Sequence, residues 1–340
     1  MTKLASQKNP TILDVAEKAK VAVGTVSRYL NGQSLRSGNS EKVAIAIADL
    51  GFRRSNAAAE LRRTKSKFVG FILPMFDEFH TDVLAHVIQD LREHGYIVLP
   101  YSHGNQKLHL PDALSYFSEH RVAALITSGD TGYEKHAAAL RALKIPLILY
   151  SNELQGLDVD RVLVNDRAAA IGATRHLIEM GHRRIAVLTG NMADSTAQSR
   201  FAGFCEALAQ DGQPPPAPNR IAGGGWLQHH GYLGTKALLD LPEPPTAIFS
   251  SNYMLTLGAF QVLREMGLSV PENVSFVTFG DIAHYPFYGG GVTAVQFPIQ
   301  SIANSITEHF ISRHQGKDLP LSRTISHDCS LIIRGSVRRI

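Results

Sequence analysis

Short apolar runs alternate with helical patterns from Phe68 onward, and this alternation limits the possible folds more than any other feature. The predicted strands are residues 69–74, 96–101, 123–128, 146–151, 161–166, 184–190, 246–252 and 274–280. The predicted helices among them are residues 81–94, 110–119, 133–143, 166–180 and 199–210. Continuous apolar strands that alternate with helices are typical of parallel sheets covered on both faces. About 270 residues are too many for one such sheet, so we expect two α/β subdomains that face each other across a cleft.

The segment before this region carries short helical patterns of its own. Thr11 is placed as an N-cap, and Asp14 follows three residues later in the capping-box position. A second helix over residues 22–30 directs Val26 and Leu30 inward and exposes Val23, Gly24, Ser27 and Arg28. A third helix is predicted over residues 40–50. Two short helices joined by a tight turn predict a helix-turn-helix, whose second helix fits the major groove of DNA.

The charge of the chain is unevenly distributed. Residues 1–67 contain 13 of the 34 lysines and arginines but only 5 of the 30 aspartates and glutamates. This segment therefore carries a net charge of +8, whereas the remainder carries −4. A basic segment attached to a mildly acidic body indicates a polyanionic partner, with a merely solvated basic face as the alternative.

The composition excludes several classes of protein. With 44% hydrophobic and 19% charged residues, the chain is typical of a globular protein and not of a disordered one. No window approaches the roughly 18 apolar residues of a membrane span, and residues 1–10 have no apolar core of a secretory signal, so we expect a cytoplasmic protein without a membrane partner. The phosphate-loop, HExxH and GxSxG motifs are absent, which argues against an enzyme or a cofactor. Neither the histidine pair at 229–230 nor His327 with Cys329 has the further ligands that a metal site needs.

The pattern T-x-x-D-V-A-x-x-A-x-V-x-x-x-T-V-S-R-x-L-N-G between Thr11 and Gly32 resembles the headpiece of the LacI/GalR family of bacterial transcription regulators. LVNDRAAAIGATRHLIEMGHRRIAVLTG, SRFAGFCEAL, PPTAIFSSN, SVPENVSFVTFGDI and LIIRGSV in the body resemble the same family. The resemblance implies an all-α helix-turn-helix headpiece and an α/β core of the periplasmic-binding-protein type, with two parallel-sheet subdomains. The implied boundaries are 10–52 for the headpiece, 53–66 for a hinge helix, and 67–340 for the effector-binding and dimerisation domain. Within that domain, the subdomains are implied at 67–165 with 297–325, and at 166–296 with 326–340.

The resemblance also implies which residues contact DNA. Val23, Gly24 and Arg28 stand where family members read base edges, and Leu61 matches a hinge leucine that enters the minor groove. The other implied DNA contacts are Thr11, Thr25, Ser27, Asn31, Ala57 and Ala58. The alternative for the hinge is a flexible basic linker. Lys20 departs from the family, which usually has glycine there.

The implied effector-binding residues are Phe79, His80, Ser128, Ser151, Arg200, Trp226, Asn252 and Phe297. Arg200 lies in the R-x-A-G-F motif that usually binds effector oxygens, with a surface ion pair as the alternative. Tyr253 and Gly280 stand where the family often has aspartates, and Ser151 stands where some members have an acidic residue. The cleft is therefore expected to keep Arg200 and lose its anions, which favours an anionic effector. A sugar acid is the first expectation, a phosphorylated sugar the second and a neutral sugar the third.

The function expected from these residues is that of an effector-responsive transcription regulator. It is expected to repress a carbohydrate or sugar-acid utilisation operon and to bind a palindromic operator as a dimer. A homodimer is favoured over a tetramer because no heptad repeat follows LIIRGSV. The alternative is a cytosolic sugar-binding protein without a role on DNA, and residues 11–65 argue against it.

Overall fold

The computed structural model describes residues 10–36, 38–52, 66–104, 110–129, 132–154, 156–316 and 322–340. The chain divides into two compact units, residues 1–66 and residues 67–340. Each unit has its own hydrophobic core, and each is described by itself below.

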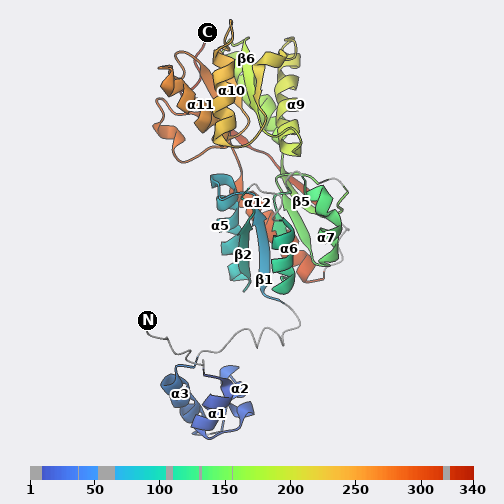
Figure 1. Ribbon diagram of the computed structural model, residues 1–340, viewed down its shortest axis with the longest axis vertical. Helices are drawn as coiled ribbons and strands as arrows, with labels where there is room; N and C mark the ends of the chain where they lie inside the picture. Colours follow the sequence, from blue (N-terminus) through green and yellow to red (C-terminus); the bar gives the residue numbers. More distant parts are fainter. Residues whose placement is uncertain are drawn as a thin grey trace, which may run out of the picture. The chain divides into compact units, whose positions relative to one another are not determined.

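The described residues of the first unit form the helices α1 (Ile12–Ala19), α2 (Val23–Leu30) and α3 (Asn39–Leu50) (Figure 1). The predicted capping box is confirmed, because Asp14 accepts the backbone N–H of Thr11 at 2.6 Å while the Thr11 hydroxyl accepts that of Asp14. The helices enclose a small core of Val15, Ala16, Ala19, Val26, Val43 and Ala46. These small side chains allow the three short helices to pack closely. Helix α2 contributes Val26 to this core, and its opposite face lies outside it.

The second unit contains two subdomains, each built on a six-stranded sheet (Figure 1). The N-subdomain sheet has the order β11-β5-β4-β3-β1-β2, and all of its neighbouring strands are parallel. Its strands are β1 (Phe68–Leu73), β2 (Ile97–Ser102), β3 (Leu125–Thr127), β4 (Leu147–Tyr150), β5 (Asp160–Val164) and β11 (Thr324–His327). Its helices are α5 (Glu78–Glu93), α6 (Leu110–Glu119), α7 (Ala137–Ala142) and α12 (Ile299–His314), with the 3-10 turn η2 (Tyr133–His136).

The C-subdomain sheet has the order β12-β10-β9-β8-β6-β7, in which β12 is antiparallel to β10. Its strands are β6 (Ile185–Thr189), β7 (Ile221–Gly223), β8 (Ala247–Ser250), β9 (Ser275–Phe279), β10 (Thr293–Gln296) and β12 (Ser330–Ile332). Its helices are α8 (Asp166–Glu179), α9 (Ser195–Gln210), α10 (Gln228–Leu239) and α11 (Tyr253–Glu265), with the 3-10 turns η3 (Pro218–Arg220) and η4 (Tyr285–Phe287).

The central strands of both sheets are buried on both faces, as the apolar runs predicted, whereas edge strands such as β2 and β11 are partly exposed. In β1, Val69, Phe71 and Leu73 belong to one core cluster while Ile72 belongs to the cluster on the opposite face. The C-subdomain likewise has separate core clusters, one containing Val187 and the other Leu188. The predicted fold class is therefore confirmed, with two parallel-dominated sheets in one unit.

Several element boundaries differ from the sequence prediction. The predicted strand over 161–166 ends at Val164, because the Asn165 side chain caps α8 and Asp166 is already helical. Helices α5 and α9 begin earlier than expected, at Glu78 and Ser195. Strand β11 runs to His327, so the last of three crossings between the subdomains falls after that residue and not after residue 325.

Candidate functional site

A cavity of about 410 Å³ lies between the two subdomains of the second unit. Its walls come from the carboxyl ends of strands in both sheets, where Pro74 follows β1, Ser151 follows β4, Asn191 follows β6 and Asn252 follows β8. Ligands of doubly wound sheets bind at this edge because the strand order reverses there and leaves a crevice. We call this cavity the cleft.

The structure brings seven of the eight expected effector-binding residues together in the cleft, namely Phe79, His80, Ser151, Arg200, Trp226, Asn252 and Phe297. Ser128 is not among the residues that line it. The Ser128 side chain is fully buried, and its carbonyl accepts the N–H of Asn152 at 3.0 Å. The placement of Ser128 in the cleft is therefore wrong, because the loop after β4 packs over this strand end.

Arg200 has protein partners, contrary to the expectation. Its Nε donates to Asp166 Oδ1 at 2.7 Å, its Nη1 donates to the carbonyl of Ser251 at 2.7 Å, and only 6% of its surface is exposed. The guanidinium also lies 3.9 Å from the ring centroid of Phe279, which is a cation–π contact. Burial raises the pKa of the Asp166 carboxyl, and the charge of Arg200 opposes that rise. Arg200 is thus charge-compensated by α8, against which its own helix packs.

The cleft has also kept anionic groups, at positions other than those expected. Asp77 and Asp194 line it. Asp77 caps α5, and its Oδ1 lies 2.6 Å from Nδ1 of His80, while Asp194 Oδ2 accepts the indole N–H of Trp226 at 2.6 Å. The interpretation that the cleft lost its anions is therefore wrong, because carboxylates from two loops replace those absent at positions 253 and 280.

Aromatic rings form much of the remaining surface of the cleft. The rings of Phe79 and Phe297 are 4.6 Å apart between centroids, and Phe297 also contacts Phe279 at 5.5 Å. Asn252 holds this surface together, because its amide nitrogen donates to the carbonyl of Trp226 at 3.2 Å and its amide oxygen caps α11. Aromatic faces beside polar groups suit a ligand with both apolar and hydroxyl-bearing surfaces.

The cleft also contains residues that were not among the expected effector contacts, including Asp77, His103, Asn152, Asn191, Asp194, Thr196, His230 and Tyr253. His103 directly follows β2 and Asn152 follows β4, so the rule that ligands bind at carboxyl strand ends could have identified both. Thr196 and His230 lie in the first turns of α9 and α10, where no pattern in the sequence marks them as facing the cleft.

The headpiece presents the outer face of α2, although Ser27, which was expected to be exposed, is half-buried. Val23, Gly24 and Arg28 are exposed, whereas Val26 is buried. Arg28 Nε donates to the carbonyl of Gly24 at 3.3 Å, so its guanidinium lies along this exposed face. The remaining expected DNA contacts in the headpiece are Thr11, which is used in the capping box, the half-buried Thr25 and Ser27, and Asn31 at the end of α2. Ala57, Ala58 and Leu61 lie outside the described residues.

A metal-ligand cluster and a membrane-spanning helix are both absent from the residues that the structure describes. Within these ranges, no three histidine, cysteine, aspartate or glutamate side chains come together as metal ligands would. No helix in the described part of the chain combines the length and apolar character needed to cross a bilayer.

A helix-turn-helix headpiece and a cleft between two α/β subdomains define a DNA-binding regulator with a small-molecule site. Comparison with known families agrees, since residues 66–330 match the periplasmic binding proteins and sugar binding domain of the LacI family, and residues 11–55 match the bacterial regulatory proteins of the lacI family. The chain therefore belongs to the LacI family of transcription regulators.

Similar proteins share nearly its full length. The transcriptional repressor CytR of Escherichia coli is 28% identical and the ribose operon repressor of Haemophilus influenzae is 26% identical, with at least 96% of each chain covered. These relatives are transcription regulators and not enzymes. The lac repressor dimer bound to operator and an anti-inducer has a TM-score of 0.82 at 23% identity, covering 97% of this chain and 100% of that one. That likeness shows the same fold.

Proposed function

We propose that this chain is a transcriptional repressor that binds a near-palindromic operator as a homodimer and responds to a carbohydrate bound in the cleft. One observation supports the proposal most directly. The same chain contains an exposed face of α2 and a cleft at the carboxyl ends of the strands of two sheets. The alternative of a sugar-binding protein without a role on DNA leaves the headpiece unexplained. Operators lie on chromosomal DNA, so we place the protein in the cytoplasm.

Surface exposure and charge support DNA binding by the headpiece. Val23 and Arg28 are positioned to contact base edges or phosphates, and Gly24 lets the backbone of α2 approach DNA closely. The net charge of +8 on residues 1–67 supplies a counterion-release contribution to binding. We further propose that Leu61 inserts into the minor groove at the operator centre, with Ala57 and Ala58 allowing close approach.

The charges of the cleft favour a neutral sugar as the effector. The expectation of a sugar acid depends on an Arg200 charge that no carboxylate compensates, but Asp166 lies 2.7 Å from its Nε. Asp77 and Asp194 add carboxylates that repel an anion and accept hydrogen bonds from hydroxyl groups. We therefore place a neutral sugar first, a sugar acid second and a phosphorylated sugar third.

Closure of the cleft links the effector to DNA. The chain crosses three times between the subdomains, and these crossings allow the cleft to open and close. A ligand held by both sheets would favour the closed cleft. Closure changes the orientation of the N-subdomain, which directly follows residues 53–66 in the chain, relative to its dimer partner. Such a ligand shifts the population of two states by its difference in affinity for them.

Selection of DNA fragments by the full-length protein tests the DNA half of the proposal. Enriched sequences should share two inverted half-sites, and affinity should fall steeply between low and physiological salt, as counterion release requires. Leu61→Ala should weaken operator binding and leave sugar binding unchanged. A single asymmetric site, or an affinity that does not change with salt, would contradict the proposal.

Calorimetry with matched ligands tests the effector class. Ribose and glucose represent neutral sugars, gluconate a sugar acid and glucose 6-phosphate a phosphorylated sugar. The charge argument predicts that glucose binds the full-length protein more tightly than gluconate at low salt. Tighter binding of gluconate would restore the sugar acid to first place.

A further inference from the structure

Two seams of hydrogen bonds join the subdomains beside the cleft. In the first, the backbone N–H of Glu78 in the N-subdomain donates to the Tyr253 hydroxyl at 2.9 Å, and the N–H of Ala283 donates to Glu78 Oε1 at 3.0 Å. In the second, Asn152 Oδ1 accepts the N–H of Thr196 at 3.2 Å, and the N–H of Glu153 donates to the Ser195 hydroxyl at 2.9 Å. We call these the Glu78 seam and the Asn152 seam.

One partner in the Glu78 seam, Tyr253, stands at a position where the resemblance to the family implies an aspartate. Tyr253 begins α11 and is only 7% exposed, yet its hydroxyl reaches the first residue of α5 in the other subdomain. Burial and the carboxylates of Asp77 and Glu78 raise the pKa of this phenol, so it stays protonated near neutral pH. An aspartate at this position is too short to reach the same N–H.

Gly280 supplies the space for this arrangement. An added Cβ at Gly280 would lie 3.5 Å from the Tyr253 ring and 3.4 Å from the Phe297 ring, so any longer side chain would meet the two rings. Its φ of 89° is also a conformation that glycine adopts most easily. The substitutions at 253 and 280 are therefore complementary, because one adds a ring and the other removes the side chain beside it.

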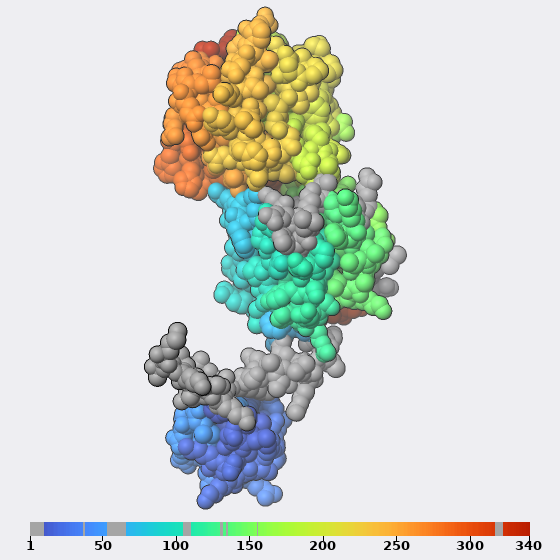
Figure 2. All heavy atoms as spheres, in the orientation of Figure 1, coloured from blue at the N-terminus to red at the C-terminus, as the bar shows by residue number. Residues whose placement is uncertain are grey.

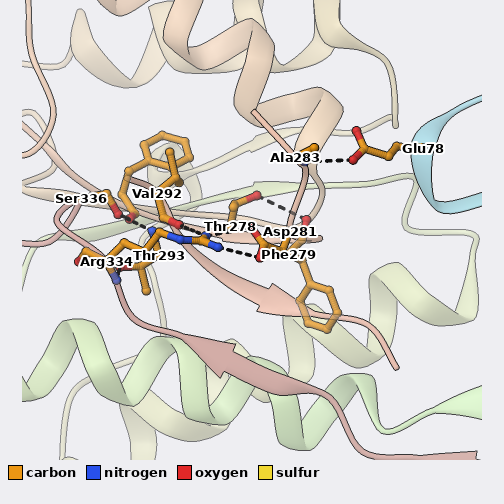
Figure 3. A network of polar contacts seen from close by, with 10 residues as sticks. Glu78, Thr278, Phe279, Asp281, Ala283, Val292, Thr293, Arg334 and Ser336 are labelled. Atoms are coloured by element: carbon orange, nitrogen blue, oxygen red, sulfur yellow. Dashed lines mark hydrogen bonds and ion pairs between the residues drawn. The ribbon is translucent and has the colours of Figure 1, made fainter. Parts of the chain in front are cut away.

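The loop after Gly280 carries Ala283, whose N–H makes the second hydrogen bond of this seam, and contacts with Arg334 hold the loop in place (Figure 3). Asp281 accepts two bonds from Arg334, at 2.8 Å each, and Arg334 Nη1 also donates to the carbonyl of Val292 at 2.7 Å. Figure 3 shows Glu78 approaching Ala283 from a separate part of the chain, on the side opposite Arg334. Asp281 thus fixes the loop that presents the Ala283 N–H to Glu78.

We propose that Tyr253 and Glu78 are the residues that set the closing equilibrium of the cleft in this protein, with Gly280 leaving the space in which Tyr253 crosses. This inference deepens the proposed effector response and rests on it. Tyr253 is a positioning residue, since it acts on the response by holding α5 against the C-subdomain. The bonds are between protein groups, so they favour closure in addition to any contacts with a ligand.

Hydrogen exchange at the Asn152 seam tests the proposal, because the variants of Tyr253 and Glu78 change only residues of the Glu78 seam. Thr196 is the second residue of α9, where helices leave the N–H without an intrahelical acceptor, so its protection depends on Asn152 across the cleft. Loss of one hydrogen bond corresponds to about a five-fold change in an equilibrium. Tyr253→Phe should therefore accelerate exchange at Thr196 and Glu153 about five-fold, although both lie in the Asn152 seam.

Matched variants separate closure from a local effect. Tyr232→Phe removes a tyrosine hydroxyl that binds Glu265 at 2.7 Å within the C-subdomain, and it should leave exchange at Thr196 unchanged. Glu78→Ala should reproduce the acceleration, and Glu78→Gln, which keeps an acceptor for the Ala283 N–H, should restore most of the slow exchange. Protection of β6 in the core verifies that each variant is folded.

The outcomes are decisive without DNA or effector, so failure here is distinct from failure of the proposed function. Acceleration confined to Glu78 and Ala283 would show that Tyr253 acts only locally and would overturn the proposal. Equal acceleration by Tyr232→Phe would overturn it as well. Acceleration across the cleft by Tyr253→Phe and Glu78→Ala alone would establish it.

Discussion

The headpiece and the cleft hold their functional side chains in opposite ways. In the headpiece, a small core supports α2, and Arg28 stands exposed with its Nε donating to the Gly24 carbonyl of its own helix. In the cleft, Arg200 is buried and held by residues 34 and 51 positions away in the chain. Solvent and salt screen exposed charges, so removing one of them has little effect on its neighbours. A buried charge is stable only with its partner, so removing the partner destabilises the fold. Changes in the headpiece should therefore alter binding with little loss of stability, and changes in the cleft should do both.

Removal of Arg200 should have the largest effect on stability. Arg200→Ala leaves Asp166 buried without its ionic partner, which costs about 3–5 kcal/mol in comparable cases. The matched headpiece variant is Lys18→Ala, which breaks an exposed pair with Asp49 at 3.0 Å and should cost about 1 kcal/mol or less. Urea unfolding, followed separately for each unit, measures both. Similar losses for the two variants would remove the contrast between the regions.

Removal of Arg28 should show the opposite balance. Arg28→Ala should weaken operator binding by about 1–3 kcal/mol if the guanidinium reads a base, and should leave headpiece stability nearly unchanged. Anisotropy with labelled operator measures the binding, and thermal unfolding measures the stability. If Arg28→Ala unfolds the headpiece, its side chain is structural and the comparison fails.

The free energy of unfolding of the second unit should depend on pH, whereas that of the headpiece should not. His182 is fully buried between Thr246 and the carbonyl of Arg338, and burial lowers its pKa. The unfolded chain then binds the proton more readily, so stability is complete above about pH 6.5 and falls as the pH drops below it. The slope should reach at most about 1.4 kcal/mol per pH unit for this group.

Unfolding of the body between pH 7 and 5 measures this slope, and His182→Gln should reduce it. An equal slope in wild type and variant would assign the dependence to other groups, of which His176 and His230 also have pKa values lowered by burial.

The smallest effect is expected at Lys20, which ends α1 with a φ of 53°. A lysine in the left-handed region is less favourable than a glycine, so Lys20→Gly should stabilise the headpiece by about 0.5–1 kcal/mol. Lys144→Gly, at a φ of 51° in the other unit, is the matched control and should not affect the headpiece. A headpiece destabilised by Lys20→Gly would mean that the lysine side chain makes a stabilising contact.

The same contrast explains what the sequence predicted. The capping box of Thr11 and the buried position of Val26 depend on residues a few positions apart, so local patterns predicted them correctly. Both sheets were predicted because their central strands are buried on both faces. The helices after residue 210 and the short strands β7, β10, β11 and β12 were not identified from pattern.

The chemistry of the cleft was predicted only in part. Family motifs placed Arg200 and Trp226 in it correctly, but not their carboxylate partners Asp166 and Asp194. Those pairs form between a helix and another helix, or between two loops, and no spacing in the sequence encodes them. Which carboxylates balance a buried cation can be known only from the tertiary structure. For this reason the structure favours a neutral sugar, whereas the sequence favoured a sugar acid.

A ligand in the cleft is expected to control binding of the protein to its operator. The direct measurement is the affinity of the full-length protein for its selected operator, with and without a saturating neutral sugar that calorimetry shows to bind. A coupling of 1–3 kcal/mol predicts a change of about 5- to 150-fold in operator affinity. An operator affinity that stays the same while the sugar fills the cleft would contradict the account.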